Sequence, residues 1–257
     1  VQVTGHMSRG QMAAPHRSWD VPYATDGSCG PDGVCFARLH ELVQPLPAAG
    51  VHGTVIIMHG GYWKSRFGID DEYGNAGTAS LAPFFAKRGF AAVELEYRRR
   101  EHQGGGWPGT NQDVLDSMQC LAVLQEQAHA LTGSMEKSTP GTQLDNLSRN
   151  MSDESAQFFL EALRGLRLDK LVLVGHSAGG CLALWAAHKL NSSNPVDPRL
   201  HVTMVLALAP VADLIRGHEL RISDDGDAVE RYMQRTPDTE SDIAEYRKAS
   251  PAALLPV

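Results

Sequence analysis

One serine in this chain lies in a pattern typical of a nucleophilic hydroxyl. Gly175, Ser177 and Gly179 form a G-x-S-x-G sequence within VLVGHSAGGCLAL, residues 172–184. The pattern follows a short apolar run and opens an apolar helical stretch, which is the strand-turn-helix context that the chemistry requires. A serine at such a sharp turn needs small neighbours, and we expect its φ to be positive. The N–H of Ala178, at the start of the helix, is then a predicted donor to a developing oxyanion.

A second stretch could supply further oxyanion donors. HGGYW, residues 59–63, ends an earlier apolar run with two glycines. Backbone at such a position can approach a ligand closely and donate N–H groups, although an ordinary tight turn is the alternative. Tyr62, Trp63 and Trp107 follow expected strand ends, where ligands bind in open α/β sheets. We predict Trp63 and Trp107 as substrate-binding residues, with plain packing as the alternative.

The elements that must position these residues alternate between strands and helices. Short β-branched or apolar runs bounded by glycines predict strands, and apolar residues at helical spacing predict helices. This alternation indicates a three-layer α/β fold with a mainly parallel central sheet. The strands are expected at 34–42, 53–61, 91–97, 170–175 and 201–209, and the helices at 81–85, 114–124, 158–166 and 177–190.

Two polar stretches lie outside this pattern. Residues 1–30 are rich in Gly, Ser and Pro, and we predict a mobile arm there. Residues 132–157 are dominated by polar and small side chains, so they are expected to form a poorly ordered surface insert. The remainder, residues 31–257, is predicted to be a single domain.

Composition and charge exclude several classes of protein. The net charge is −7 and the only dense basic run is RRR at 98–100, so no nucleic-acid partner is expected. The apolar runs are shorter than the ~18 residues of a membrane span, and no membrane partner is expected. Four cysteines without a CxxC pair indicate a reducing, cytoplasmic setting. No His, Cys and carboxylate cluster has ligand spacing, so no metal is predicted. The oligomeric state is left open.

Several stretches, in this order, resemble one known group of proteins: MHGGYWKSRFG, ELEYRRR, GGGWPGTNQDV, VGHSAGGCLALWAA, LALAPVADL and YRKASPAALLP. They are similar to the esterase and arylformamidase (kynurenine formamidase-like) group of α/β-hydrolases, from about residue 54 to the last residue. The resemblance implies that Ser177 is the nucleophile. It also implies that amides around Gly60, Gly61 and Tyr62, together with Ala178, form the oxyanion hole.

These observations favour a serine hydrolase that needs no cofactor. It would cleave small carboxylic esters or aryl-formamides through an acyl-enzyme. The formamide preference depends on HGGYW alone, so a general carboxylesterase is a close alternative and a peptidase a more distant one. A non-catalytic binding module that keeps the fold is the alternative from a different class.

A nucleophilic serine needs a base, and in α/β-hydrolases the acid and the histidine follow the serine in the chain. His188 would lie about 16 Å along the helix from Ser177, and His201 begins a strand at the opposite end of the sheet. Only His218, with Asp213, falls on the correct side. By resemblance, SPAALLPV leads into the strand that precedes the acid. We therefore expect that the C-terminal strands carrying the triad acid and histidine are missing and that the chain as given is nearly inactive.

Overall fold

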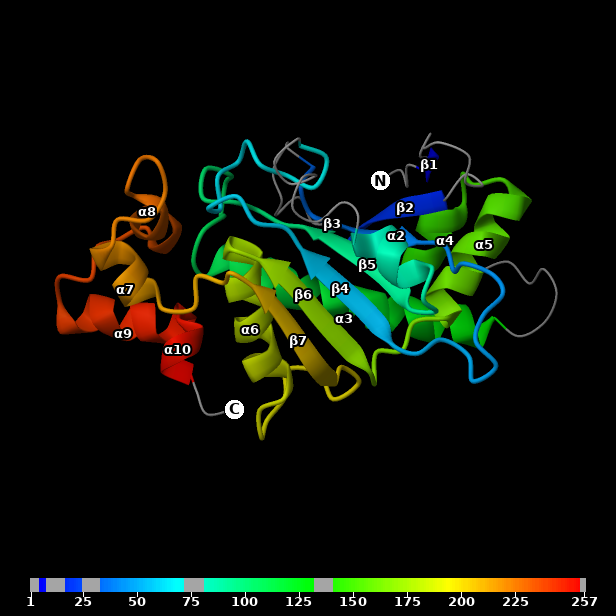
Figure 1. Ribbon diagram of the computed structural model, residues 1–257. Coiled ribbons are helices and arrows are strands. Elements are labelled where there is room, and N and C mark those ends of the chain that lie inside the picture. The colour runs from blue at the N-terminus through cyan, green and yellow to red at the C-terminus, as the bar shows by residue number, and fades with distance from the viewer. Residues whose placement is uncertain (1–4, 8–16, 25–32, 72–80, 132–140, 255–257) are drawn as a thin grey trace.

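The computed structural model describes residues 5–7, 17–24, 33–71, 81–131 and 141–254, and within them seven strands form one sheet. The strand order is β1-β2-β3-β5-β4-β6-β7 (Figure 1). The pairs β5–β4, β4–β6 and β6–β7 are parallel, and β1–β2, β2–β3 and β3–β5 are antiparallel. The strands are β1 (Gly5–Met7), β2 (Arg17–Pro22), β3 (Phe36–His40), β4 (Thr54–Met58), β5 (Ala91–Glu96), β6 (Leu171–His176) and β7 (Val202–Leu208).

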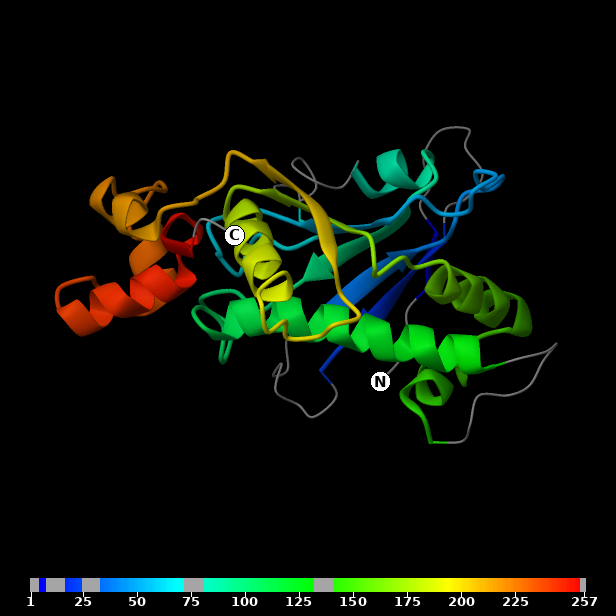
Figure 2. The same ribbon diagram turned by 90° about the horizontal axis from the view of Figure 1, so that it is seen from below.

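Helices cover both faces of this sheet, as expected for a three-layer fold. Helices α3 (Gly109–Ala130), α5 (Asp153–Arg164) and α6 (Ala178–Leu190) lie on one face, and α2 (Leu81–Ala86) lies on the other (Figure 2). The larger core lies beneath the first three helices, and a smaller one lies beneath α2. Within the described residues, none of the helices is long and apolar enough to cross a membrane.

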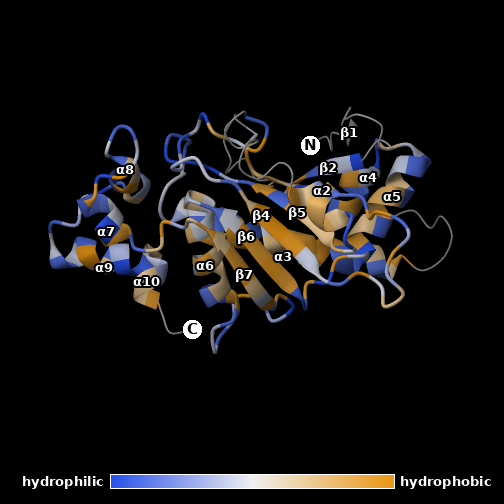
Figure 3. Ribbon diagram, viewed as in Figure 1, coloured by the Kyte–Doolittle hydropathy of each residue, from blue (hydrophilic) through white to orange (hydrophobic). Residues whose placement is uncertain are grey.

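The central strands are apolar because both of their faces are covered. All five residues of β4 and all six of β5 are buried, and Figure 3 shows the apolar character of β4 and β6. Such continuous apolar runs are characteristic of parallel strands between two helical layers. The carboxyl ends of β4, β5 and β6 lie at one edge of the sheet, because the three strands are parallel. The fold thereby brings together the loops that carry the candidate catalytic residues.

The C-terminal helices form a group beside this edge (Figure 1). They are α7 (Leu214–Glu219), α8 (Ala228–Met233), α9 (Glu240–Ala249) and α10 (Pro251–Leu254). Helix α7 contacts α8 and α9, and α10 contacts both α9 and α6. The group is attached to the main layers through α6 and through the loops after β4 and β5, since Trp63 stacks on Tyr232 and Trp107 donates to Glu245.

Strand β7 forms an edge of the sheet, and one of its faces is open. Met204, Leu206 and Leu208 are 61%, 41% and 38% exposed, and they alternate along the strand, so their side chains share a face. Strands of parallel sheets are ordinarily covered on both faces. Strand β7 departs from that pattern within the part of the chain that the structure describes.

The predicted mobile arm over residues 1–30 is wrong for β2. Residues Arg17–Pro22 pair with β3 in the sheet, and Trp19 and Val21 are buried. Trp19 also packs against Phe159 and donates a hydrogen bond from Nε1 to Ser155 Oγ. Alternation of apolar and polar side chains over these few residues is a strand signal, and the surrounding Gly, Ser and Pro conceal it. Residues 1–4, 8–16 and 25–30 of the arm lie outside the described residues.

The predicted insert over residues 132–157 is likewise wrong for most of its length. Helix α4 (Gln143–Ser148) and the first turn of α5 lie within it, and Leu144 and Leu147 are buried. Thr142 and Ser152 cap the two helices by accepting hydrogen bonds from Asp145 N and Ser155 N. Two apolar residues at helical spacing and two side-chain caps thus order a polar segment. Residues 132–140 lie outside the described residues.

The cysteines differ in their redox state. Cys120 and Cys181 are buried free thiols, whereas Cys35 is disulfide-bonded. The expectation of reduced cysteines is therefore wrong for Cys35. Spacing gave no sign of this, because a disulfide depends on distances between backbone positions in the folded chain.

Candidate active site

Ser177 occupies a sharp turn between β6 and α6, as the glycine spacing predicts. Its φ is 54° and its ψ is −114°, so the prediction of a positive φ is confirmed. The backbone at this turn is hydrogen-bonded to the end of β7 and to the chain that follows it. Ser177 N donates to Leu208 O at 2.8 Å, and Val211 N donates to Ser177 O at 3.2 Å. The serine side chain remains partly exposed.

The two glycines of the motif allow α6 to approach the sheet. A Cβ added to Gly175 would lie less than 3.0 Å from the backbone of Gly179, and one added to Gly179 would meet the carbonyl oxygens of Met58 and His59 at a similarly forbidden distance. These are backbone atoms, which cannot turn aside as a flexible side chain can. Only glycine at both positions lets the start of α6 rest on the end of β4.

The loop of residues 59–63, which we call the oxyanion loop, passes directly beside Ser177. A Cβ on Gly60 would lie 3.3 Å from Ser177 Cβ and 2.9 Å from His176 O. Tyr62 and Trp63 adopt φ values of 53° and 55°, a region that non-glycine residues seldom occupy. Such strain is concentrated at functional sites where the surrounding structure enforces it.

The structure therefore brings together the segments that carry the predicted donors. Gly60 packs against the serine, Gly61 and Tyr62 follow in the same loop, and Ala178 is the first residue of α6. The first N–H groups of a helix have no acceptor within the helix, which leaves that of Ala178 available to a ligand. The roles of these four residues as oxyanion donors remain predictions.

Packing accounts for the contacts of Trp63. Its side chain is 0% exposed and stacks on Tyr232 of α8, with ring centroids 4.1 Å apart. The ring is covered in this structure, and the role of Trp63 in substrate binding remains a prediction. Trp107 is half-buried, donates from Nε1 to Glu245 Oε2 at 3.1 Å and meets Trp185 edge-on. Its substrate-binding role remains a prediction.

The one downstream histidine on the expected side of the sheet has a packing role. The ring of His218 lies edge-on to Tyr246, with centroids 6.2 Å apart. Asp213 is the N-cap of α7, and its Oδ1 accepts from Arg216 N at 3.0 Å. Among the residues that the structure describes, no histidine is hydrogen-bonded to Ser177.

Sequence reasoning missed a buried charged cluster behind the oxyanion loop. His59 Nε2 lies 3.2 Å from Glu96 Oε1, and Arg99 Nη1 donates to the same oxygen. All three side chains are at most 5% exposed. Burial alone would raise the pKa of Glu96, but the charge and hydrogen bond of His59, together with Arg99, lower it below its ordinary value. The signal in the sequence was Glu96 at the end of an apolar strand. A buried charge needs a partner of opposite charge or hydrogen-bond donors, so this glutamate indicated a buried cluster.

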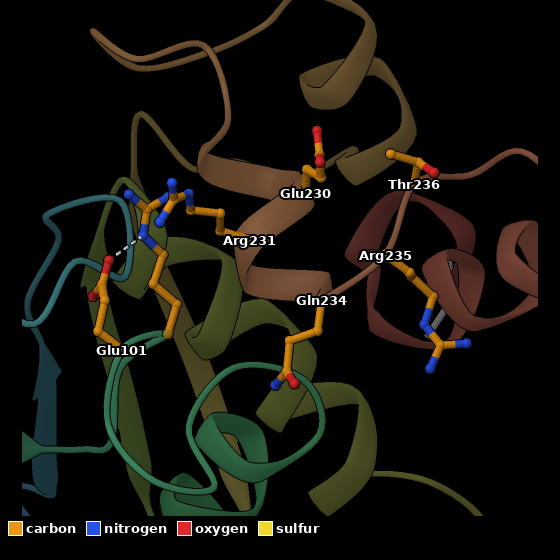
Figure 4. A pocket seen from close by; sticks show the side chains of 7 residues that line it. Glu101, Glu230, Arg231, Gln234, Arg235 and Thr236 are labelled. Atoms are coloured by element: carbon orange, nitrogen blue, oxygen red, sulfur yellow. Dashed lines mark hydrogen bonds and ion pairs between the residues drawn. The ribbon is translucent and has the colours of Figure 1, made fainter.

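A pocket of about 480 Å³ lies between α8 and the loop after β5 (Figure 4). Its arginines already have partners: Arg100 pairs with Glu101 and Asp227, Arg231 pairs with Asp227, and Arg235 pairs with Asp242. Neither Ser177 nor any oxyanion-loop residue lines it. The pocket is thus separate from the predicted chemistry. Its lining residues are Arg100, Glu101, Glu230, Arg231, Gln234, Arg235 and Thr236.

Comparison with known proteins identifies the architecture. No protein-family model and no curated protein sequence matches this chain. Esterase B from Lactobacillus rhamnosis is 20% identical, with a TM-score of 0.56 over 93% of this chain and 60% of that one. Esterase Est2 from the Planctomycetes species Thermogutta terrifontis is 17% identical, with a TM-score of 0.50 over 93% and 66%. A truncated carbohydrate esterase from gut microbiota is 16% identical, with a TM-score of 0.55 over 97% and 75%.

The structural matches establish the fold, since the identities are too low to carry function with them. The chain spans 60% of the length of esterase B. Its sheet order, the helices on both faces and the turn at Ser177 agree with the architecture that the motifs predict. This chain has an α/β-hydrolase fold.

Proposed function

We propose that this protein is a serine hydrolase that cleaves small carboxylic esters through an acyl-enzyme formed on Ser177. The observation that carries the proposal is the strained Ser177, held at φ 54° between β6 and α6 with Gly60 packed against it. Strain of this kind costs about 1–3 kcal/mol and persists where the surrounding structure enforces it. The solved esterase structures with the same architecture are consistent with this chemistry.

The reaction would have two halves. Ser177 Oγ attacks the acyl carbon, and its proton passes through a general base to the departing alcohol. Amides around Gly60, Gly61 and Tyr62, together with that of Ala178, would stabilise the negative oxygen of the tetrahedral intermediate. Water then attacks the acyl-enzyme and releases the acid and the free serine. Among the described residues, no histidine is hydrogen-bonded to Ser177, and the proposal names no residue as the base.

Among the acyl compounds that a serine hydrolase cleaves, aryl-formamides are a more specific candidate substrate than esters in general. The HGGYW sequence of the oxyanion loop, which resembles that of arylformamidases, supports this choice. A general carboxylesterase is the alternative. Comparing turnover of p-nitrophenyl acetate and N-formylkynurenine by the same preparation distinguishes the two. A preference for the formamide supports the narrower assignment, and turnover of the ester alone supports the broader one.

A fluorophosphonate probe tests the proposed nucleophile directly. Such probes phosphonylate activated serines, so stoichiometric labelling that disappears in Ser177→Ala is the expected result. Ser192 provides a matched control, because it follows the opposite end of α6 and its hydroxyl donates to Lys189 O. Labelling of Ser192→Ala should equal that of the wild type.

A non-catalytic binding module that keeps the fold is the alternative from a different class. A chain of this kind would keep the fold without an activated hydroxyl. Wild-type protein that is folded but neither reacts with the probe nor hydrolyses either substrate would overturn the hydrolase proposal in favour of this module.

A further inference from the structure

Two successive residues of the oxyanion loop adopt a left-handed backbone conformation that their surroundings must enforce. Tyr62 and Trp63 have φ values of 53° and 55°, and neither is a glycine. Such conformations persist only where the rest of the structure over-determines them. Lys64 N donates to Gly61 O at 2.9 Å across the loop, and Arg100 N donates to Trp63 O at 2.9 Å from the chain after β5. What holds the Trp63 side chain therefore bears on the shape of the whole loop.

The ring of Trp63 is stacked on Tyr232 of α8. The ring centroids are 4.1 Å apart, the planes are 13° from parallel, and both side chains are fully buried. Stacked aromatic pairs attract each other beyond the effect of the area that they bury. Because the two rings meet face to face, turning the indole to another rotamer would lose this contact. The stack therefore fixes the direction of the Trp63 side chain and restricts the backbone that carries it.

Tyr232 is itself anchored through both its side chain and its backbone. Its hydroxyl donates to Oδ1 of Asn111, a fully buried residue in the first turn of α3. Its carbonyl oxygen accepts from Trp107 N at 2.7 Å. Gly106 permits this approach, since a Cβ there would lie 2.7 Å from the same oxygen. Tyr232 is therefore fixed to the start of α3 independently of its contact with Trp63.

The segment that carries Tyr232 also holds the residue that follows the oxyanion loop. The Lys64 side chain is 6% exposed, and its Nζ donates to Asp225 Oδ2 at 2.5 Å. Asp225 lies in the loop that precedes α8. Two neighbouring residues, Trp63 and Lys64, are thus both held by residues 225–232, which lie more than 160 positions later in the chain.

We infer that Tyr232 is a positioning residue that holds the oxyanion loop beside Ser177. The inference rests on the proposed function, since it assigns how that site is held. The Tyr232 ring fixes Trp63 and thereby keeps the backbone of Tyr62 and Trp63 left-handed. The loop then stays where Gly60 packs on Ser177, with an added Cβ only 3.3 Å from the serine Cβ. This placement matters because an oxyanion donor has to lie within about 2.7–3.1 Å of the developing charge.

The effect of Tyr232 on the loop can be read without any activity. Tyr232→Leu removes the stacked ring, and Tyr232→Phe keeps the ring and removes only the hydroxyl. The ¹³Cα signals of Tyr62 and Trp63 in NMR spectra depend chiefly on φ and ψ, so they report the left-handed backbone. We expect both signals to move in Tyr232→Leu and to stay at their wild-type positions in Tyr232→Phe. Unchanged ¹³Cα signals in Tyr232→Leu would overturn the inference.

The consequence for the site is read from Ser177. In Tyr232→Leu the rate constant for phosphonylation at saturating probe should fall by about 10- to 100-fold with affinity for the probe unchanged, because misplacement of about 1 Å costs this much. Tyr232→Phe should retain the wild-type rate constant.

Tyr246→Leu is the matched control. Tyr246 lies in α9, within the same group of C-terminal helices, and is as fully buried as Tyr232. Its hydroxyl donates to Arg235 O at 2.7 Å, and its ring meets His218 of α7. Tyr246→Leu should therefore lower Tm as Tyr232→Leu does and leave the rate constant of Ser177 unchanged.

The outcomes separate the two proposals. Unchanged labelling in Tyr232→Leu would overturn the positioning role even if Ser177 is reactive in the wild type. Equal slowing in Tyr246→Leu would mean that any loss of packing among the C-terminal helices has this consequence, and would also overturn it. A wild-type protein that is never labelled would refute the hydrolase proposal, while the ¹³Cα signals would still decide the role of Tyr232. If Tyr232→Leu does not fold, Tyr232→Met replaces it with the same expectations, because the flexible methionine fills irregular gaps.

Discussion

Adding one methyl group to Gly179 should disturb both the stability of the fold and the reactivity of Ser177. A Cβ at this position would lie less than 3.0 Å from the carbonyl oxygens of Met58 and His59, whereas ordinary contacts are 3.4–4 Å. The start of α6 must therefore move away from β4 by more than about 0.4 Å. Ser177 is the N-cap of the same helix, so it moves relative to the oxyanion loop.

The expected magnitude follows from two opposing effects. Alanine favours a helix over glycine by at most about 1 kcal/mol, while overpacking typically costs about 1–3 kcal/mol and more when backbone is displaced. We expect Gly179→Ala to lower the free energy of unfolding by about 2 kcal/mol. For a chain of this size this lowers Tm by about 4–8 °C. The rate of Ser177 labelling should fall by about 100-fold.

Thermal unfolding and fluorophosphonate labelling measure the two effects, with Gly217→Ala as the matched control. Gly217 lies in α7, and its added Cβ would meet only side-chain methyl groups of Val229, Ile222 and Val211 at 3.1 Å or more. That variant should unfold within about 1 kcal/mol of the wild type. If Gly179→Ala is as stable as the control and labels at the wild-type rate, the packing of α6 on β4 does not position Ser177.

Three further expectations concern strain, thiols and acid. Ser177→Gly removes backbone strain of about 1–3 kcal/mol, while the greater entropy of the unfolded chain costs about 0.5–1 kcal/mol. Urea denaturation should therefore give a free energy of unfolding about 1 kcal/mol higher than that of the wild type, and labelling should be abolished. A lower free energy of unfolding would contradict this. Burial raises the pKa of Cys120 to about 11 and that of Cys181 to about 12. Both thiols should therefore resist a disulfide reagent at about pH 8 until the protein is denatured, and reaction in the native state would count against their burial. The folded-state pKa of Glu96 lies below its ordinary 4.5, so its contribution to stability is present above pH 4.5 and is lost as the pH falls through the folded value. Glu96→Gln should lose less stability than the wild type between about pH 7 and pH 3 in urea titrations, and parallel curves would refute this.

Local constraints made the site of the nucleophile predictable. The glycines around Ser177 and the apolar runs of β4 and β6 respond to requirements that hold over a few residues: small neighbours at a sharp turn, and burial of both faces of a strand. A requirement of this kind restricts the residue types at adjacent positions, so it can be recognised in the sequence. The strand-turn-helix around Ser177, its positive φ and the three-layer architecture therefore follow from the sequence.

The sequence-based predictions failed for segments whose contacts are with residues far away in the chain. Strand β2 is held by its pairing with β3, and α4 by contacts of Leu144 and Leu147 with the core. The strand and helix signals of these two segments are short, and the polar and small residues around them conceal both. Trp63 faces Tyr232, which is 169 positions away, so the covering of its ring depended on the fold.

The sequence by itself determined that a serine would stand at a strained turn of an α/β sheet, because glycine spacing and apolar periodicity are properties of neighbouring residues. Only the tertiary structure decided what surrounds that turn. His59 and Glu96 are 37 positions apart, and they meet because β4 and β5 are parallel neighbours whose carboxyl ends coincide. A buried charge depends on the partners that the fold brings to it, and no local pattern states which partners those are.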